Sequence, residues 1–206
     1  MLILPGSKKS KPSDDSSKNP GYSDDYFGFS DGACHTYNVT KTVEGITIEG
    51  TFVTEVEKIQ EPAAPAGLEI LKITQSYSSE ALGPSLVNYY GKVKDSSGDN
   101  YYYYMLTTES GYKISYDEDD LIFVAPLKIG DKYLGIEIIR EEEATVPFGS
   151  FTAFVARQKD SEIDATGWIV PYLGTVKSDI TITATFEGET GTIEMSMELT
   201  SYTRPE

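Results

Sequence analysis

The sequence predicts an all-β domain of about ten to twelve antiparallel strands with little helix, curled into a sandwich or an open half-barrel. Apolar and polar side chains alternate in the segments 180–186 and 193–199, as in strands that cover a core on one face and meet water on the other. Segments rich in β-forming residues also follow one another at short intervals. No segment shows an apolar stripe of helical period longer than about two turns.

Turn signals divide the first half of the domain into strands. Glu44-Gly45 is a tight-turn candidate between two β-rich runs, and a loop at Pro62–Gly67 precedes the next run. Pro84 interrupts the pattern, and Asp95–Asn100 supplies a further turn. We expect strands at 36–43, 46–59, 68–77, 87–94 and 101–108.

The second half continues in the same way. The acidic run Asp117–Asp120 separates two short β-rich segments, and Pro126 ends the second of them. The run Glu187–Gly191 joins the two alternating segments at the C-terminus as a hairpin. We expect strands at 111–116, 121–125, 132–143, 151–159, 167–170, 180–186 and 193–199.

The first 25 residues differ in composition from the rest. Residues from Ser7 to about Asp25 have almost no apolar content, so they cannot bury enough surface to offset the entropy of ordering. We expect residues 1–25 to be a flexible tether or a signal or lipoprotein remnant, and residues 26–206 to form a single β domain. In a bacterial lipoprotein an acylated cysteine would start such a spacer, at the place of Ser7. A frayed terminus is the alternative.

The charge balance excludes some classes of partner. The chain carries 33 acidic and 17 basic residues, for a net charge of −16. A surface this negative repels phosphate backbones and anionic lipid headgroups. We therefore expect no nucleic-acid partner, and membrane association only through a lipid anchor.

The sequence contains little that points to catalysis or metal binding. Cys34 and His35 are the single cysteine and the single histidine, but neighbours in an extended segment point to opposite faces. Asp95, Ser97 and Asp99 have a calcium-loop spacing without the rest of the loop, and Asp117–Asp120 is typical of a solvated turn. We predict no catalytic residue, no metal site and no cofactor.

Tyrosine is the unusual residue of this chain. There are fifteen, including the run Tyr101–Tyr104, with Tyr89-Tyr90 just before the same hairpin turn. Alternation sends them to both faces of a strand, so some are expected outside, where they could bind sugar rings or a protein partner. The alternative is structural, because tyrosine favours strands and aromatic pairs stabilise sheets.

Motifs in the second half resemble a known family. The segments 126–133 (PLKIGDKY), 146–151 (VPFGSF) and 167–177 (GWIVPYLGTVK) are followed by 198–202 (ELTSY). Their order and spacing resemble an uncharacterised domain family of bacterial lipoproteins and secreted proteins, with the patterns PLKVGDxW, PAGTF, WYAPGVGLVK and LxSY. Tyr133 stands where that family usually has Trp. The resemblance implies a fold similar to the lipoprotein-carrier group (LolA, LolB, LppX), a single strongly curved antiparallel sheet around an apolar concavity.

The resemblance implies a function but supplies no catalytic residues. It favours a non-enzymatic, exported or cell-envelope protein that binds a lipid-like apolar ligand or a partner protein. Such a protein can carry a lipid anchor. A surface adhesin or carbohydrate-binding module that uses exposed tyrosines is the alternative, and a hydrolase that uses acidic residues is the third hypothesis. The candidate ligand-binding residues are Tyr89, Tyr102, Tyr104, Trp168 and Tyr172. Trp168 is also a candidate core residue.

Overall fold

The computed structural model describes residues 26–60, 67–94, 96, 99–108, 111–114, 121–186 and 189–204. This part of the chain forms thirteen β-strands and no helix, so it contains no helix that could cross a membrane. The strands are β1 (Cys34–Val43), β2 (Ile46–Ile59), β3 (Leu68–Tyr77), β4 (Leu86–Lys94), β5 (Asn100–Thr108), β6 (Gly111–Ile114), β7 (Leu121–Ala125), β8 (Lys132–Tyr133), β9 (Ile136–Val146), β10 (Gly149–Lys159), β11 (Ile163–Val170), β12 (Gly174–Phe186) and β13 (Glu189–Thr203). The predicted tether at 1–25 and the acidic run Asp117–Asp120 lie outside the described residues.

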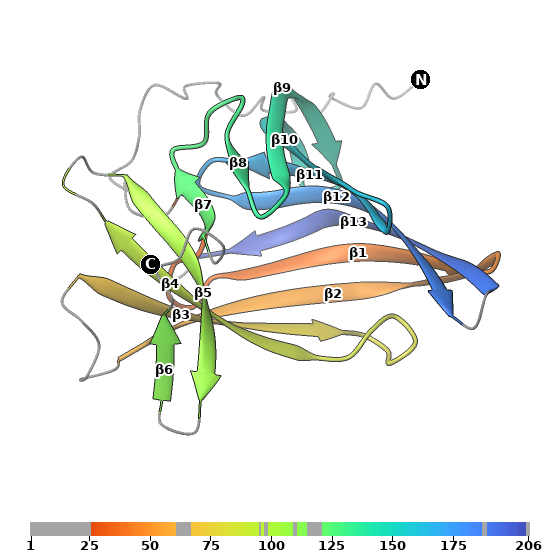
Figure 1. Ribbon diagram of the computed structural model, residues 1–206, viewed down its shortest axis with the longest axis horizontal. Helices are drawn as coiled ribbons and strands as arrows, with labels where there is room; N and C mark the ends of the chain where they lie inside the picture. Colours follow the sequence, from red (N-terminus) through yellow and green to blue (C-terminus); the bar gives the residue numbers. More distant parts are fainter. Residues whose placement is uncertain are drawn as a thin grey trace, which may run out of the picture.

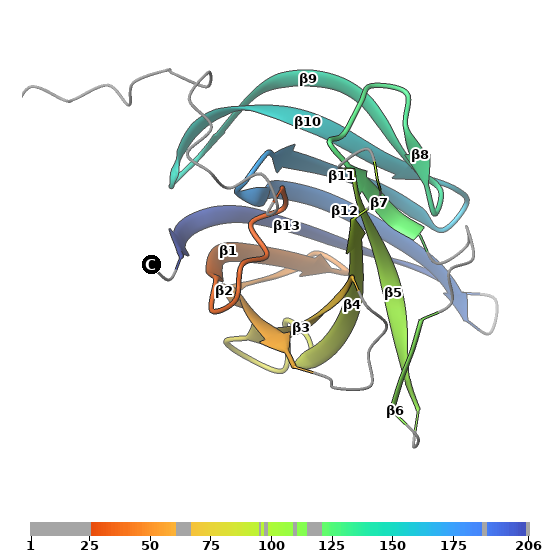
Figure 2. The same cartoon turned by 90° about the vertical axis from the view of Figure 1, so that its left-hand side faces the viewer.

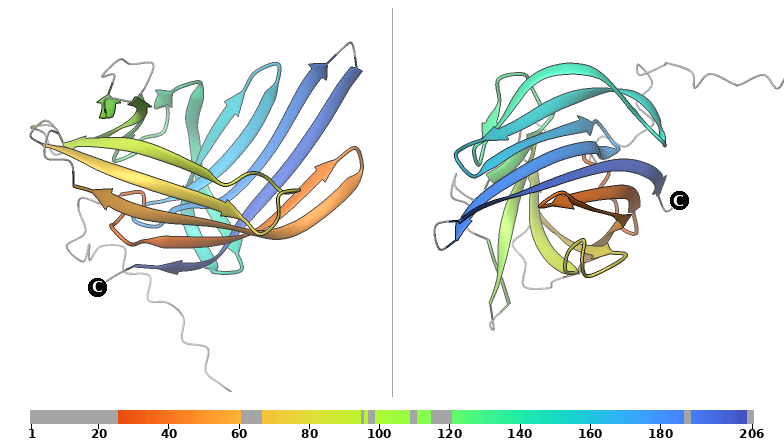
Figure 3. Two further views of the ribbon diagram at one scale, coloured as in Figure 1. Left: turned by 90° about the horizontal axis from the view of Figure 1, so that it is seen from below. Right: turned by 90° about the vertical axis from the view of Figure 1, so that its right-hand side faces the viewer.

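All strands belong to one antiparallel sheet, which confirms the predicted fold class (Figure 1). Its order is β6-β5-β4-β3-β2-β1-β13-β12-β11-β10-β9-β8, and β7 pairs with β5. The sheet is thus two meanders, β1 to β6 and β8 to β13, joined where the first strand pairs with the last. Figures 2 and 3 show the two meanders curving toward each other, so that the sheet has a concave and a convex side.

Irregular pairing helps the sheet to curve. The register shifts between Thr36 and Tyr37 in β1, between Val155 and Ala156 in β10, and between Trp168 and Ile169 in β11. Such bulges bend a strand and increase its local twist. Two buried clusters then form, one around Phe27, Leu71 and Ile138 and one around Val39, Phe52 and Leu199.

Two hairpins turn through two-residue loops in which both residues have positive φ. Glu44 and Gly45 both have positive φ, 51° and 80°, as a two-residue hairpin loop requires, so the predicted turn is confirmed. A second such turn, at Leu134 (φ 47°) and Gly135 (φ 78°), splits the strand expected at 132–143 into β8 and β9. The sequence did not predict this turn because leucine is not a turn-forming residue.

A segment before β1 covers one end of the concave side, which we call the closed end. Tyr26, Phe27 and Ala33 are buried there, and the Tyr172 amide donates to Tyr26 O over 2.6 Å. Gly174 (φ 88°) permits the close approach, because a Cβ at this position would lie 2.5 Å from Phe27 O. The closed end is therefore fixed by backbone contact as well as by aromatic packing.

The opposite end carries an uncovered apolar row, which we call the open end. Five residues face one another across five neighbouring strands: Ile163, Ile182, Ile193, Val43 and Ile46. Ile46 is 67% exposed and Ile182 is 39% exposed, and the other three are half-buried. Directly opposite residues lie on the same face of a sheet, so the row forms one continuous strip.

Candidate functional site

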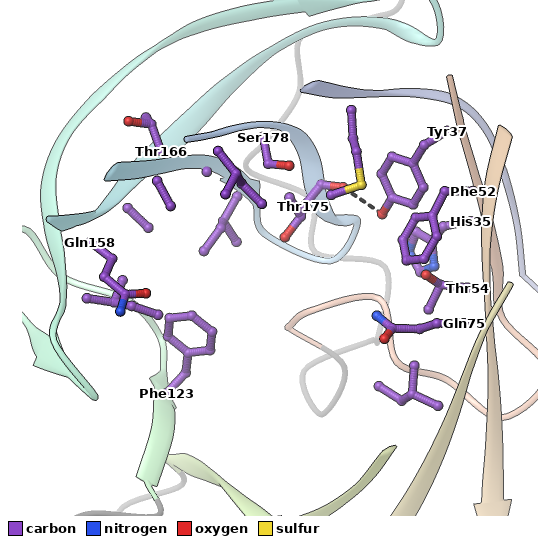
Figure 4. A pocket seen from close by; sticks show the side chains of 18 of the residues that line it. His35, Tyr37, Phe52, Thr54, Gln75, Phe123, Gln158, Thr166, Thr175 and Ser178 are labelled. Carbon is purple, nitrogen blue, oxygen red and sulfur yellow. Dashed lines mark hydrogen bonds between the residues drawn. The ribbon is translucent and has the colours of Figure 1, made fainter. Parts of the chain in front are cut away.

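A cavity of about 320 Å³ lies between the two buried clusters on the concave side. Tyr37 and Phe52 come to it from one cluster, and Ile73, Ala156 and Ile169 come from the other. Phe29, from the segment that covers the closed end, forms part of its wall. Figure 4 shows side chains of both meanders facing one another across the cavity. Its volume falls at the lower end of the range for small-molecule sites, roughly 300 to 1,000 Å³.

The cavity leads toward the open end. Ile180 and Met197 line it, and the next inward positions on their strands toward the hairpin tip are Ile182 and Met195. Residues two apart on a strand point to the same side, so the apolar row of the open end lies on the face that bears the cavity. An apolar surface thus runs from the cavity wall to an exposed edge.

The residues that line the cavity are apolar or neutral polar residues and one imidazole, His35. None of its residues is Asp, Glu, Lys or Arg, although these make up 24% of the sequence. The polar side chains that line it are His35, Thr54, Gln75, Gln158, Thr166, Thr175 and Ser178, together with the phenols of Tyr37 and Tyr90. The site therefore offers hydrogen bonds in an otherwise apolar space.

Hydrogen bonds hold several of these groups in place. The His35 ring, which is buried, bonds through Nε2 to Leu173 O over 2.9 Å. The Tyr37 hydroxyl donates to Thr175 O over 2.9 Å, and burial raises the pKa of this phenol well above its ordinary value. The Asn88 amide donates to Gln75 Oε1 over 3.1 Å. The walls of the cavity are thus pre-formed by the protein itself.

The tyrosines of the hairpin do not form an exposed platform at Tyr102. This side chain is 3% exposed and packs edge to face on Phe27, with 4.9 Å between the ring centroids. Tyr102 is therefore not one of the tyrosines that stand outside, because the segment before β1 packs over that face of β5. Tyr89 is half-buried, and the side chain of Tyr104 lies outside the described part.

Neither of the two aromatic candidates of the second half, Trp168 and Tyr172, lines the cavity. Trp168 is half-buried, donates through Nε1 to Glu142 Oε1 over 2.7 Å, and has the Lys177 ammonium 5.3 Å from its ring centroid. Tyr172 has a positive φ of 66° and packs against Tyr26. Binding of a ligand by Tyr89, Tyr104, Trp168 or Tyr172 stays a prediction.

The polar residues of the cavity were missed from the sequence, although a signal exists for them. Ser178 lies between Val176 and Ile180 in the inward positions of β12, and Gln75 follows Leu71 and Ile73 in the inward positions of β3. A polar residue in an inward series is unexpected for a filled core. Reading each strand for such exceptions could have found the site.

Catalytic and metal chemistry gain no support from the described residues. His35 is buried on the cavity side, whereas Cys34 is half-buried. The pKa of the Cys34 thiol is raised, mainly by burial and also by the negative charge of Glu55. A raised thiol pKa disfavours the nucleophilic thiolate. In the part of the chain that the structure describes, no group of three or more His, Cys, Asp or Glu side chains could hold a metal ion.

Comparisons with known proteins do not assign a family. No family model and no curated protein matches the chain. A crystal structure of a candidate lipoprotein from Parabacteroides distasonis ATCC 8503 is 13% identical, with a TM-score of 0.47, over 87% of this chain and 100% of the other. A DUF1329 family protein from Desulfovibrio piger ATCC 29098 is 10% identical, with a TM-score of 0.24, over 82% of this chain and 84% of the other.

A third solved structure, MucB in complex with MucA(peri), is 9% identical, with a TM-score of 0.19, over 84% of this chain and 89% of the other. At these identities and TM-scores, none of the three structures gives the chain a family or a function. The motif resemblance to lipoproteins and secreted proteins therefore stays a prediction.

Proposed function

We propose that this chain is a non-enzymatic, exported or cell-envelope domain that binds an apolar small molecule in the cavity of its concave side. One observation carries the proposal: none of the twenty residues that line the cavity is Asp, Glu, Lys or Arg. At the chain's overall charged content of 24%, about five of twenty positions would be charged. Small-molecule sites are typically apolar clefts with a few convergent polar groups.

The open end supports the same proposal. Exposed, in-register isoleucines are unfavourable in water unless something covers them, and they continue the wall of the cavity. A ligand longer than the cavity can place its remaining apolar part on this row. The composition of residues 1–25 and the lipoprotein-like motifs support an exported location.

The test is native mass spectrometry, with lipid extraction, of the protein purified from a membrane-containing host. We expect a co-purifying apolar molecule at near-stoichiometric level. The variant Gly167→Leu should remove it, because Gly167 lines the cavity and a Cβ added there meets nothing within 4 Å, so the larger side chain projects into open space.

Gly191→Leu is the matched control. A Cβ at Gly191 also meets nothing within 4 Å, and this exposed residue of β13 does not line the cavity. The control should retain the bound molecule. A clean apo mass for the unsubstituted protein, together with no binding of added apolar dyes, would refute the proposed function.

A further inference from the structure

Ser178 is a buried hydroxyl on the cavity wall. It lies on β12, is 8% exposed, and its Oγ has no hydrogen-bond partner among the described residues. Its strand neighbours on the same face, Val176 and Ile180, are apolar. A buried hydroxyl left without a partner is unfavourable, so its place is explained if a bound group completes its hydrogen bonding.

Two amide side chains face the same space. Figure 4 shows Gln75 of β3 and Gln158 of β10 directed toward the cavity from opposite sides, with Ser178 on the wall between them. Because Asn88 donates to Oε1 of Gln75, the amide NH₂ of Gln75 is the group turned to the cavity. The hydroxyl and the amides can each donate and, for Ser178 and Gln158, also accept.

The same wall has no Asp, Glu, Lys or Arg side chain to pair with an ionised group. A carboxylate placed there would lose water without meeting Lys or Arg, and an ammonium would not meet Asp or Glu. Either loss is costly, and the net charge of −16 adds repulsion for an anion that approaches. The hydrogen-bonding groups therefore suit an uncharged partner.

We propose that the ligand is a neutral amphiphile, an apolar chain that bears a hydroxyl, ester or amide group which hydrogen-bonds with Ser178 inside the cavity. This inference rests on the proposed function and adds the head group that the site selects. The apolar chain lies along Ile180 toward the open end. Fatty acids in their ionised form and alkylamines in their charged form are rejected by desolvation.

The head-group preference is tested by displacement of Nile red, an uncharged apolar dye, at pH 8. The competitors are 1-decanol, decanoate, decylammonium and 1-bromodecane, which share a ten-carbon chain and differ in the terminal group. We expect 1-decanol to displace the dye at concentrations on the order of a hundredfold below those of the two ions, because the ions lose hydration in the cavity. Equal displacement by 1-decanol and decanoate would overturn the inference.

The role of Ser178 is tested with Ser178→Ala in the same assay. Loss of one neutral hydrogen bond should weaken the binding of 1-decanol by about two- to tenfold. The substitution should leave the binding of 1-bromodecane, which has no hydroxyl, unchanged. Ser201→Ala, at an exposed position of β13, is the matched control and should change the binding of neither compound.

The outcomes separate this inference from the proposed function. If Nile red and all four competitors fail to bind, the proposed function is wrong. If Nile red binds and Gly167→Leu abolishes its binding, the cavity is the site. In that case equal effects of Ser178→Ala on 1-decanol and 1-bromodecane would show that Ser178 contacts water or nothing, and would refute the neutral-head-group inference alone.

Discussion

The closed and open ends of the concave side have the same strand pattern but different surroundings. At the closed end Phe27 is 3% exposed among other aromatic rings, whereas at the open end Ile46 is 67% exposed. Phe27 packs on side chains that point inward from the sheet, and Ile46 belongs to a row of such side chains. The difference comes from one returning segment, residues 26–33, which covers one end and not the other.

This comparison shows that alternation defines a face without saying what covers it. Where the returning segment packs, the face becomes a core that contributes stability. Where nothing described packs, the same chemistry leaves an apolar surface that leads into a cavity. Three pairs of substitutions test this division, and each pair compares a residue at or beside the closed end with a residue elsewhere.

A large effect is expected for Gly174→Ala at the closed end. Its φ of 88° disfavours any side chain, and the new Cβ would also lie 2.5 Å from Phe27 O, so the backbone of the returning segment must shift. Gly45→Ala at the open end is the control, because Gly45 has a similar φ of 80° but nothing within 4 Å. Urea unfolding should show a loss of about 1 to 2 kcal/mol for Gly45→Ala.

For Gly174→Ala the loss should exceed that of the control by about 1 to 3 kcal/mol, the usual cost of forcing extra volume into a packed region. The excess measures the close contact alone, because the conformational term is common to both variants. Equal losses would mean that the returning segment is not held against Gly174 in solution.

A second pair of substitutions compares buried and exposed apolar side chains. Phe27→Ala should lower the free energy of unfolding by about 3 to 5 kcal/mol, because it leaves a cavity among Tyr26, Phe29 and Tyr102. Ile46→Ala should change it by less than about 1 kcal/mol, because the side chain is mostly exposed. Similar losses for both variants, measured by chemical denaturation, would show that the open end is covered in the free protein.

The smallest effect is expected at an ion cluster next to the closed end. Burial alone would raise the pKa of Glu69, but its hydrogen bond to Lys58 and the charges of Lys92 and Lys58 outweigh burial and lower the pKa below its ordinary value. A lowered pKa in the folded state stabilises the fold above the pKa of the unfolded state. This stabilisation is lost as the pH falls through the pKa of the folded state.

Glu69→Gln should therefore cost less than about 1 kcal/mol at pH 7, and the difference from the unsubstituted protein should shrink at acid pH. Glu137→Gln removes a more exposed pair with Lys132 and is the control, with a smaller expected change at pH 7. Unfolding curves at both pH values measure the effect. A difference that grows on acidification would contradict the assignment of the ion cluster.

Much of the sheet could be predicted from the sequence, because strand alternation and turn residues are local. The hairpin at Glu44-Gly45 and the alternating strands β12 and β13 were predicted in this way. The split at Leu134-Gly135 could not be, since the positive φ of Leu134 is imposed by the hairpin and not by its own preference.

The cavity was less accessible to prediction. The concavity was expected only from the family resemblance, since a filled core and an open cavity are lined by the same apolar residues. The burial of Tyr102 depends on a segment more than 70 residues away in the sequence, which no local pattern encodes. The polar residue Ser178 in an inward series was the local trace that the site left in the sequence.

The pairing of β1 with β13 has a consequence for how the chain folds. Cys34 is opposite Thr203, so among the described strands the sheet pairing that joins the two meanders is made by the first and the last strand. A ribosome must synthesise β13 before this seam can form, and such long-range pairing is slow because a large loop must close first. Until then β1 and β12 both present unpaired edges, and unpaired edges can pair wrongly with other strands.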